Sequence, residues 1–233
     1  MQKPEPVHTW LARILSWGAA GCVTVLVLVG IFRCMIFSDL FHAFEHRRLG
    51  TVQRFTQASP MTVMQQLQAY FRSDGQQLLD HALFSYRERL HYREVKQVLQ
   101  GTEAAFAWGM VGFIGLTMGL LYRTRRTLGW PLGPIASVCK RVAVILVGVI
   151  AICGLFALNF EAHFLRFHTL LFTTRNWLLP SSSATIQLFP PRYFFDFLLV
   201  YATLVLCTAT LLVVLARYAL KSAPRWASGV NAE

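Results

Sequence analysis

The stretch Ile14–Phe37, ILSWGAAGCVTVLVLVGIFRCMIF, decides the class of fold, and Arg33 is its only charged residue. A helix needs about 20 mostly apolar residues to cross a bilayer, so this stretch predicts a membrane-spanning helix. It is too long for a cleaved signal peptide, and no small-x-small cleavage site follows it before Arg33. The stretch therefore predicts an integral membrane protein.

Three further windows, at about 104–122, 142–159 and 194–215, have the same character. The chain has 233 residues, of which 55% are apolar and only 14% charged, and this balance disfavours an ordinary soluble domain. We therefore predict an all-α polytopic membrane protein with four transmembrane helices in one membrane domain over 1–233. The five cysteines follow no metal or disulfide spacing.

The basic residues predict the orientation of these helices. The formal net charge is +11, and +8 of it lies in the N-terminal segment, the loop between the second and third windows, and the C-terminal tail. The segments 38–103 and 160–196 carry +1 each. Because positive charge accumulates in cytoplasmic loops, both termini are predicted to be cytoplasmic, with 38–103 and 160–193 facing outward. The charge is a topology signal and does not indicate nucleic-acid binding.

The first outward segment is long and looks helical. Apolar residues recur at three- and four-residue spacing over 60–71, where Pro60 is suited to open a helix, and again over 78–99. Residues 73–75 form a break, and Gly101 is a plausible stop. We therefore expect two amphipathic helices on the outer membrane surface.

The second outward segment, 160–193, is rich in aromatic residues but contains Pro180, Pro190 and Pro191. The prolines exclude one continuous helix, and irregular backbone at membrane depth must be covered by protein or line a cavity. We interpret the segment as a partly re-entrant lining of a lipid pocket; an interfacial loop without a pocket is the alternative. The predicted pocket residues are Phe167, Leu171, Phe172 and Trp177.

Six histidines lie in the outward segments or at their edges: His42, His46, His81, His91, His163 and His168. Histidine titrates near neutral pH and is the commonest general base, although most such residues are simply hydrogen-bonded at an interface. His42 and His46 have the spacing of a helical metal pair, but no further ligands are evident, so we predict no metal site.

His91 has a more suggestive setting than the other histidines. Glu88 lies three residues before it and Glu94 three residues after it, so either carboxylate could orient its ring. The alternative is an exposed ladder of ion pairs with the neighbouring arginines. No GxSxG elbow, Walker loop, HExxH or paired CxxC motif occurs.

Two stretches resemble one known family. LFSYRERLHYREVKQVL, residues 83–99, resembles its outward-helix signature, and FLRFHTLLFTTRNWLLPSSSATIQLFPPRYFF, residues 164–195, resembles its second signature. The chain is thereby similar to the bacterial lipoprotein intramolecular transacylase (Lit) family of four-span membrane proteins. The two motifs cover about 50 residues, lie between the matching spans and occur in the matching order.

The resemblance implies an enzyme of the bacterial inner membrane whose active site faces outward. Its substrate is a diacylated lipoprotein in membrane lipid, and the sn-2 acyl chain moves to the α-amine of the N-terminal cysteine to give a lyso-form lipoprotein. No cofactor or metal is implied. By the residue match His91 and His168 are catalytic. Supporting roles are predicted for these residues: Glu88, Arg87, Asn176, Trp177 and Arg166.

The sequence also departs from the family pattern. An acid often follows the second histidine and another follows the proline, but Thr169 and the run 181–183 stand there. This leaves the partner of His168 open. Two alternative functions remain: a non-catalytic membrane docking or assembly protein, and another lipid acyltransferase or hydrolase.

Overall fold

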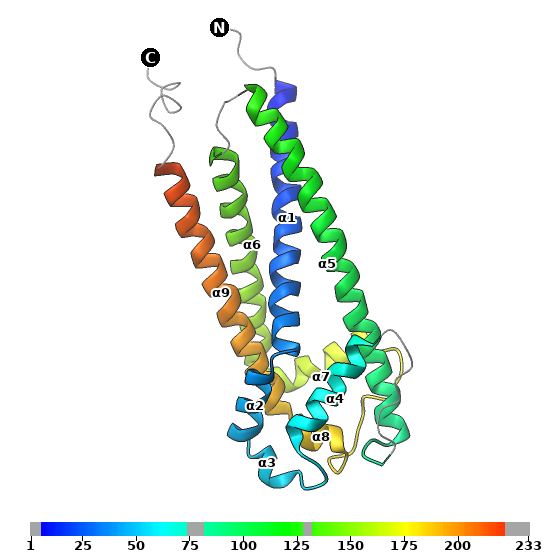
Figure 1. Cartoon of the computed structure of the whole chain (residues 1–233). Coiled ribbons are helices and arrows are strands. Elements are labelled where there is room, and N and C mark those ends of the chain that lie inside the picture. The colour runs from blue at the N-terminus through cyan, green and yellow to red at the C-terminus, as the bar shows by residue number, and fades with distance from the viewer. Residues whose placement is uncertain (1–5, 74–81, 128–131, 222–233) are drawn as a thin grey trace. The chain divides into compact units, whose positions relative to one another are not determined.

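The computed structural model describes residues 6–73, 82–127 and 132–221, and it is helical without strands over them (Figure 1). This confirms the predicted all-α class. The helices are α1 (Pro6–Ile36), α2 (Asp39–Arg48), α3 (Thr51–Arg54), α4 (Pro60–Arg72), α5 (Tyr86–Thr127), α6 (Leu132–Leu158), α7 (Phe160–Leu171), α8 (Ala184–Leu188) and α9 (Pro191–Lys221).

Three helices within the described ranges are long and apolar enough to cross a membrane. They are Arg13–Ile36 in α1, Ile135–Leu158 in α6 and Pro191–Lys221, which is the whole of α9. These helices match the first, third and fourth predicted windows, and the last two extend beyond the predicted limits. The remaining window, 104–122, lies inside α5.

Helix α5 is longer than the sequence pattern predicted. It runs for 42 residues and passes through Gly101, so the stop predicted at that glycine is wrong. A glycine inside a helix costs only about 1 kcal/mol relative to alanine, and the alanines at 104 and 105 favour continuation. The helix was expected to begin at 78. Residues 78 and 79 lie outside the described residues, but residues 82–85 are not helical and α5 begins only at Tyr86, so the expected start is too early.

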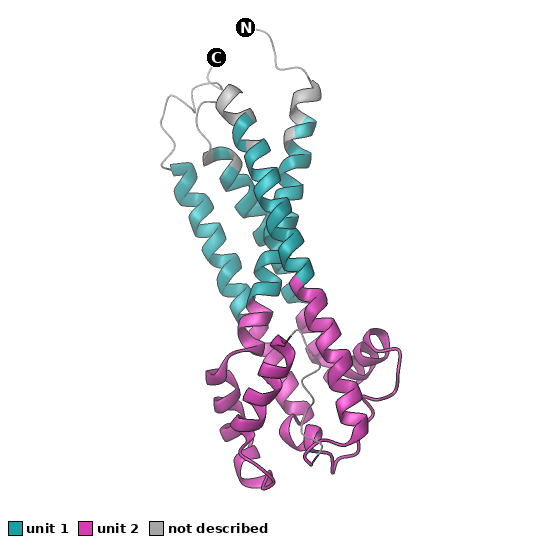
Figure 2. Cartoon of the chain, turned by 45° about the vertical axis from the view of Figure 1, so that its right-hand side comes forward, with its two compact units in different colours: residues 1–30, 104–152, 202–233 teal, residues 31–103, 153–201 magenta. Residues whose placement is uncertain are grey.

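The chain divides into two compact units (Figure 2). Unit 1 comprises residues 1–30, 104–152 and 202–233, and it contains segments of α1, α5, α6 and α9. Small residues allow α1 and α5 to approach closely, because a Cβ atom added at Gly112 would lie 2.8 Å from the Cys22 sulfur. The Arg141 guanidinium donates a hydrogen bond to the Ser16 hydroxyl, which links α6 to α1.

Unit 2 comprises residues 31–103 and 153–201 and has its own apolar core. Pro60 begins α4 and Ser73 caps its end, as predicted. The apolar side of α4 is buried in protein, since Val63 and Leu67 are each 1% exposed. The core cluster is Phe55, Val63, Met64, Leu67, Phe71, Phe84, Tyr92, Leu99, Ala184, Leu188, Phe189 and Tyr193.

The prolines of the second outward segment divide it into three pieces. Helix α7 ends at Leu171, a non-helical stretch leads to the short α8, and Pro191 is the first residue of α9. Proline is favoured at a helix start because its missing N–H would have no helical partner there. The hydroxyl of Ser183 accepts a hydrogen bond from the Ile186 N–H and so caps α8.

Candidate active site

Two histidines that are far apart in the sequence come together in unit 2. His91 lies on α5 and His168 on α7, and their ring centroids are 6.3 Å apart. Phe172 packs edge-on against His91 at 5.0 Å and lies 5.6 Å from His168. Trp177 lies 5.2 Å from His168. The two predicted histidines thus share one aromatic surrounding.

The hydrogen bond of His168 determines which of its nitrogens can accept a proton. Its Nδ1 lies 2.8 Å from the carbonyl oxygen of Phe164, which can only accept, so Nδ1 carries the hydrogen. The partner of His168 is therefore a backbone carbonyl, which the sequence could not indicate. The neutral ring keeps a free lone pair on Nε2.

His91 is held differently. It is 8% exposed, and its Nδ1 lies 3.8 Å from Oε2 of Glu94. Both atoms are buried, and neither makes a hydrogen bond. The ring is therefore constrained mainly by packing against Phe172, Tyr92 and His168.

Burial keeps both rings neutral at physiological pH. The pKa of His91 is lowered to about 4: burial is the largest cause, the nearby His168 adds to the lowering, and Glu94 opposes both. Burial also lowers the pKa of His168, against the raising effect of the Phe164 carbonyl. A neutral imidazole can accept a proton, so the pair can act as a base near pH 7.

The two carboxylates beside His91 have different partners. Glu88 is 3% exposed and accepts hydrogen bonds from the Ser85 N–H at 2.8 Å and from both the N–H and the hydroxyl of Thr185 at 2.9 and 2.8 Å. Glu88 therefore joins α5 to α8. Glu94, which accepts a hydrogen bond from the Thr174 hydroxyl, is the carboxylate that faces His91.

The other predicted supporting residues surround the pair unevenly. Arg87 donates to the carbonyl oxygen of Arg175 at 2.6 Å and so connects α5 to the loop after α7. Asn176 is half-buried, and its backbone N–H donates to the Thr174 hydroxyl at 3.3 Å. Arg166 is exposed on α7. Trp177 contacts the ring of His168, and its indole N–H is a hydrogen-bond donor.

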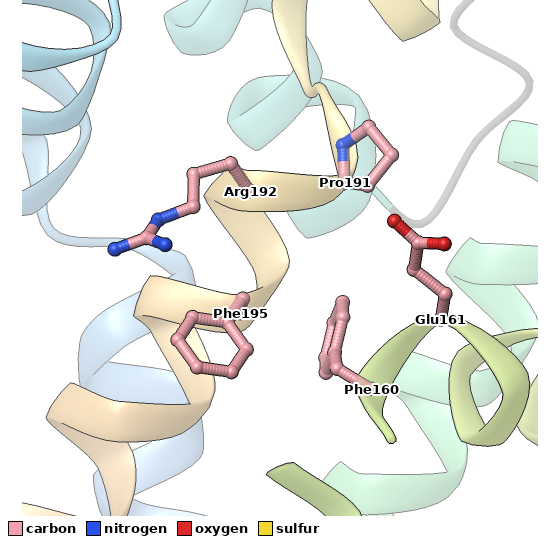
Figure 3. A pocket seen from close by; sticks show the side chains of 5 residues that line it. All are labelled: Phe160, Glu161, Pro191, Arg192 and Phe195. Carbon is pink, nitrogen blue, oxygen red and sulfur yellow. The ribbon is translucent and has the colours of Figure 1, made fainter. Parts of the chain in front are cut away.

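The predicted lipid-pocket residues differ in exposure. Phe172 is 8% exposed and touches both histidines, whereas Phe167 is 46% and Leu171 39% exposed. A separate cavity of about 220 Å³ lies near the start of α7 and is lined by Phe160, Glu161, Pro191, Arg192 and Phe195 (Figure 3). The predicted pocket residues are not among its lining residues.

The other histidines with described side chains lie apart from this pair. His42 is 2% exposed, and its Nε2 donates to the Ile36 carbonyl at 2.8 Å while its Nδ1 accepts from the Tyr193 hydroxyl. His46 is fully buried, makes no hydrogen bond and stacks on Tyr193. His163 contacts Phe156, and His81 lies outside the described residues. The described residues hold no group of three or more candidate metal ligands.

The fold and the site together define an all-helical integral membrane protein with a histidine pair, one ring buried and one half-buried, in an aromatic surrounding. A family model described as lipoprotein intramolecular transacylase Lit matches residues 16–194. The chain belongs to this family, and it is accordingly an acyltransferase. No curated protein matches the sequence.

Solved structures of a bacterial relative show the same fold. The membrane integral lipoprotein intramolecular transacylase Lit from Bacillus cereus matches with a TM-score of 0.78 and 17% identity over 91% of this chain and 97% of that chain. A histidine-to-arginine variant of that protein matches with a TM-score of 0.72 and 16% identity over 92% and 94% of the two chains. A histidine-to-alanine variant gives 0.73 and 18% over 92% and 96%.

Proposed function

We propose that this chain makes lyso-form lipoproteins by moving the sn-2 acyl chain of an S-diacylglyceryl group to the α-amine of the same N-terminal cysteine. Family membership supports the reaction class. The observation that carries the mechanism is the pairing of His91 and His168, with ring centroids 6.3 Å apart and both pKa values lowered.

The reaction exchanges one acyl bond for another. The amine nitrogen attacks the ester carbonyl carbon, a C–N bond forms, and the bond from that carbon to the glycerol oxygen breaks. The nitrogen loses one proton and the glycerol oxygen gains one, so no external acyl donor or nucleotide enters the balance. The thioether tether holds amine and ester in one molecule, and such proximity supplies much of the acceleration.

A neutral histidine suits both proton movements. An α-amine has a pKa of about 7.7–8.0, so a fraction of it is unprotonated near neutral pH and can attack. A base must then take the proton that this neutral amine loses as the C–N bond forms. The imidazolium that results can return this proton to the departing glycerol oxygen, which is typically worth about 10²–10⁴ in rate. The indole N–H of Trp177, beside His168, is our preferred donor to the developing oxyanion.

The substrate's acyl chains occupy the apolar surface around this pair. Phe172 and Trp177 supply the part next to the histidines, and Phe167 and Leu171 supply a more exposed part that meets the outer leaflet. Leu165 and Leu170 on α7 are 52% and 89% exposed, which suits an amphipathic helix lying in the membrane interface. Substrate and surrounding lipid thus contact one continuous apolar surface.

We place the chain in the bacterial inner membrane with four spans and cytoplasmic termini. Besides the three long apolar helices, the segment 104–122 of α5 is the remaining span, and it contains no charged residue. The charge partition between the connecting segments supports this orientation. The active site then faces outward, where diacylated lipoproteins are displayed, and the two compact units act together as one membrane domain.

Single-cysteine labelling tests this topology. In a background without the five native cysteines, Thr127→Cys and Ser181→Cys are each exposed to a membrane-impermeant maleimide in intact cells. We expect reaction at 181 and none at 127, because 127 lies at the end of α5 in the basic segment placed in the cytoplasm, and 181 lies in the segment placed outside. Reaction at 127 with protection at 181 reverses the orientation, and permeabilised cells control for the accessibility of each thiol.

Fragmentation of the lipopeptide product tests the reaction. The purified chain is incubated in detergent with a synthetic diacylated lipopeptide that has a free α-amine, and the product is analysed by tandem mass spectrometry. Total mass cannot report transfer because substrate and product are isomers, so the fragments must locate the acyl chain. We expect it on nitrogen, with one ester chain retained; a free fatty acid instead would indicate a hydrolase, and no change would indicate a docking protein.

A further inference from the structure

Glu94 and His91 form an incomplete pair. Oε2 of Glu94 and Nδ1 of His91 are 3.8 Å apart, both are shielded from solvent, and neither has a hydrogen-bond partner. A buried carboxylate oxygen or ring nitrogen that has no hydrogen-bond partner lowers the stability of the folded protein. A movement of less than 1 Å would bring them to about 2.8–3.0 Å, the usual hydrogen-bond distance.

The second oxygen of Glu94 is already held. Oε1 accepts a hydrogen bond from the Thr174 hydroxyl, and this hydroxyl in turn accepts one from the Asn176 N–H. Thr174 follows α7, the helix that carries His168, so the bond joins the two histidine-bearing segments of unit 2. On the opposite side of His91 along α5, Arg87 holds the same loop through the Arg175 carbonyl. The Glu94 carboxylate is thereby fixed with one oxygen free.

We propose that Glu94 is a positioning residue for His91, and that Thr174 holds its carboxylate in place. When substrate occupies the site, the free oxygen of Glu94 accepts the Nδ1–H of His91. This fixes the tautomer with its lone pair on Nε2, which takes the proton of the attacking amine, and the carboxylate stabilises the imidazolium that forms. The role rests on the proposed function. Glu88 cannot serve in this way, because Ser85 and Thr185 already occupy both of its oxygens.

The charged groups around His91 determine in which direction its pKa changes when Glu94 is replaced. The titratable groups that face it are Glu94 and Tyr92 on α5 and His168 on α7. Burial raises the pKa of Tyr92, so this ring is uncharged, as is that of Phe172. Glu94 raises the pKa of His91 and His168 lowers it. Loss of the Glu94 charge therefore lowers the pKa of His91 below its value of about 4 and makes the ring a weaker base.

The test uses full-length protein in detergent, with the synthetic diacylated lipopeptide as substrate. Glu94→Gln should lower kcat about 10- to 100-fold with little change in KM, since the pair acts on the proton transfer. Thr174→Val should give a smaller loss in the same direction, and Thr174→Ser should restore most of it. Glu103→Gln is the matched control, because Glu103 lies on the same helix but pairs with Arg33 at 2.8 Å.

A spectroscopic readout separates positioning from a structural role. In protein labelled with ¹⁵N-histidine, the His91 signals, assigned by their loss in His91→Gln, should titrate at lower pH in Glu94→Gln than in wild type. Wild-type kcat in Glu94→Gln, or a lowered kcat with an unchanged His91 titration and tautomer, would overturn the proposal. Full activity of His91→Ala would instead refute the proposed mechanism itself, so the two failures are distinguishable.

Discussion

Replacing His91 or His168 with alanine is expected to lower the rate of N-acylation by about 10²- to 10⁴-fold, the usual contribution of a general acid–base group. The two rings share one aromatic surrounding, and burial keeps both neutral, so each deletion removes a proton acceptor from the reacting centre. Fragmentation of the lipopeptide product measures the effect, because it counts only acyl chains transferred to nitrogen.

His163→Ala is the matched control for this experiment. His163 lies on α7 like His168, but its Nδ1 contacts the Phe156 carbonyl at 3.2 Å and its ring packs on Phe156. Its loss should change the rate less than threefold or so. Folded protein is verified in each variant by its thermal unfolding in detergent. A His91→Ala protein that unfolds normally and transfers at the wild-type rate would eliminate His91 as the base.

Replacing Glu88 with alanine is expected to destabilise the folded protein by about 3–5 kcal/mol. Its carboxylate is buried and accepts three hydrogen bonds from Ser85 and Thr185, and bonds to a charged group are worth about 1.5–3 kcal/mol each before non-additivity. Glu88→Gln should recover only part of this loss, since an amide NH₂ would face a donor. Thermal unfolding in detergent measures both variants.

The pH dependence of the Glu88 contribution has a definite sign. Burial alone would raise the pKa of Glu88, but hydrogen bonds from Thr185 and Ser85 outweigh burial and hold the pKa below its ordinary value of 4.5. The stabilisation is therefore fully present above about pH 4.5 and is lost as the pH falls through the folded-state value. Glu103→Ala, whose side chain is 48% exposed, should cost no more than about 1 kcal/mol at any pH. Equal unfolding temperatures for Glu88→Ala and wild type would contradict this role.

The sequence predicted the features that depend on local pattern. Apolar length identified three helices that can span a membrane, and the turn chemistry of Pro60 and Ser73 placed the ends of α4 correctly. Gly101 failed as a helix stop because its local cost is small beside the continuity of α5. A local sequence signal therefore predicts a helix end correctly where one residue, such as proline, determines the backbone conformation. It is wrong where neighbouring residues favour a different conformation.

The choice between Glu88 and Glu94 shows where sequence reasoning ends. Both lie three residues from His91, and helical periodicity places both near it. The distinction arises from partners on other elements: Thr185 on α8 captures Glu88, and Thr174 in the loop after α7 captures Glu94. Neither threonine carries a sequence signal of such a role, so only tertiary structure assigns the two carboxylates.

The contrast between the two buried histidines of α2 has a consequence for sequence drift. His46 is packed through its ring face with both nitrogens unpaired, so a change to phenylalanine would break no hydrogen bond there. A change at His42 would break its bonds to Ile36 and Tyr193. Selection should therefore tolerate exchange at position 46 and remove it at position 42. A sequence signature that required histidine at both positions would therefore reject genuine relatives in which only position 46 had changed.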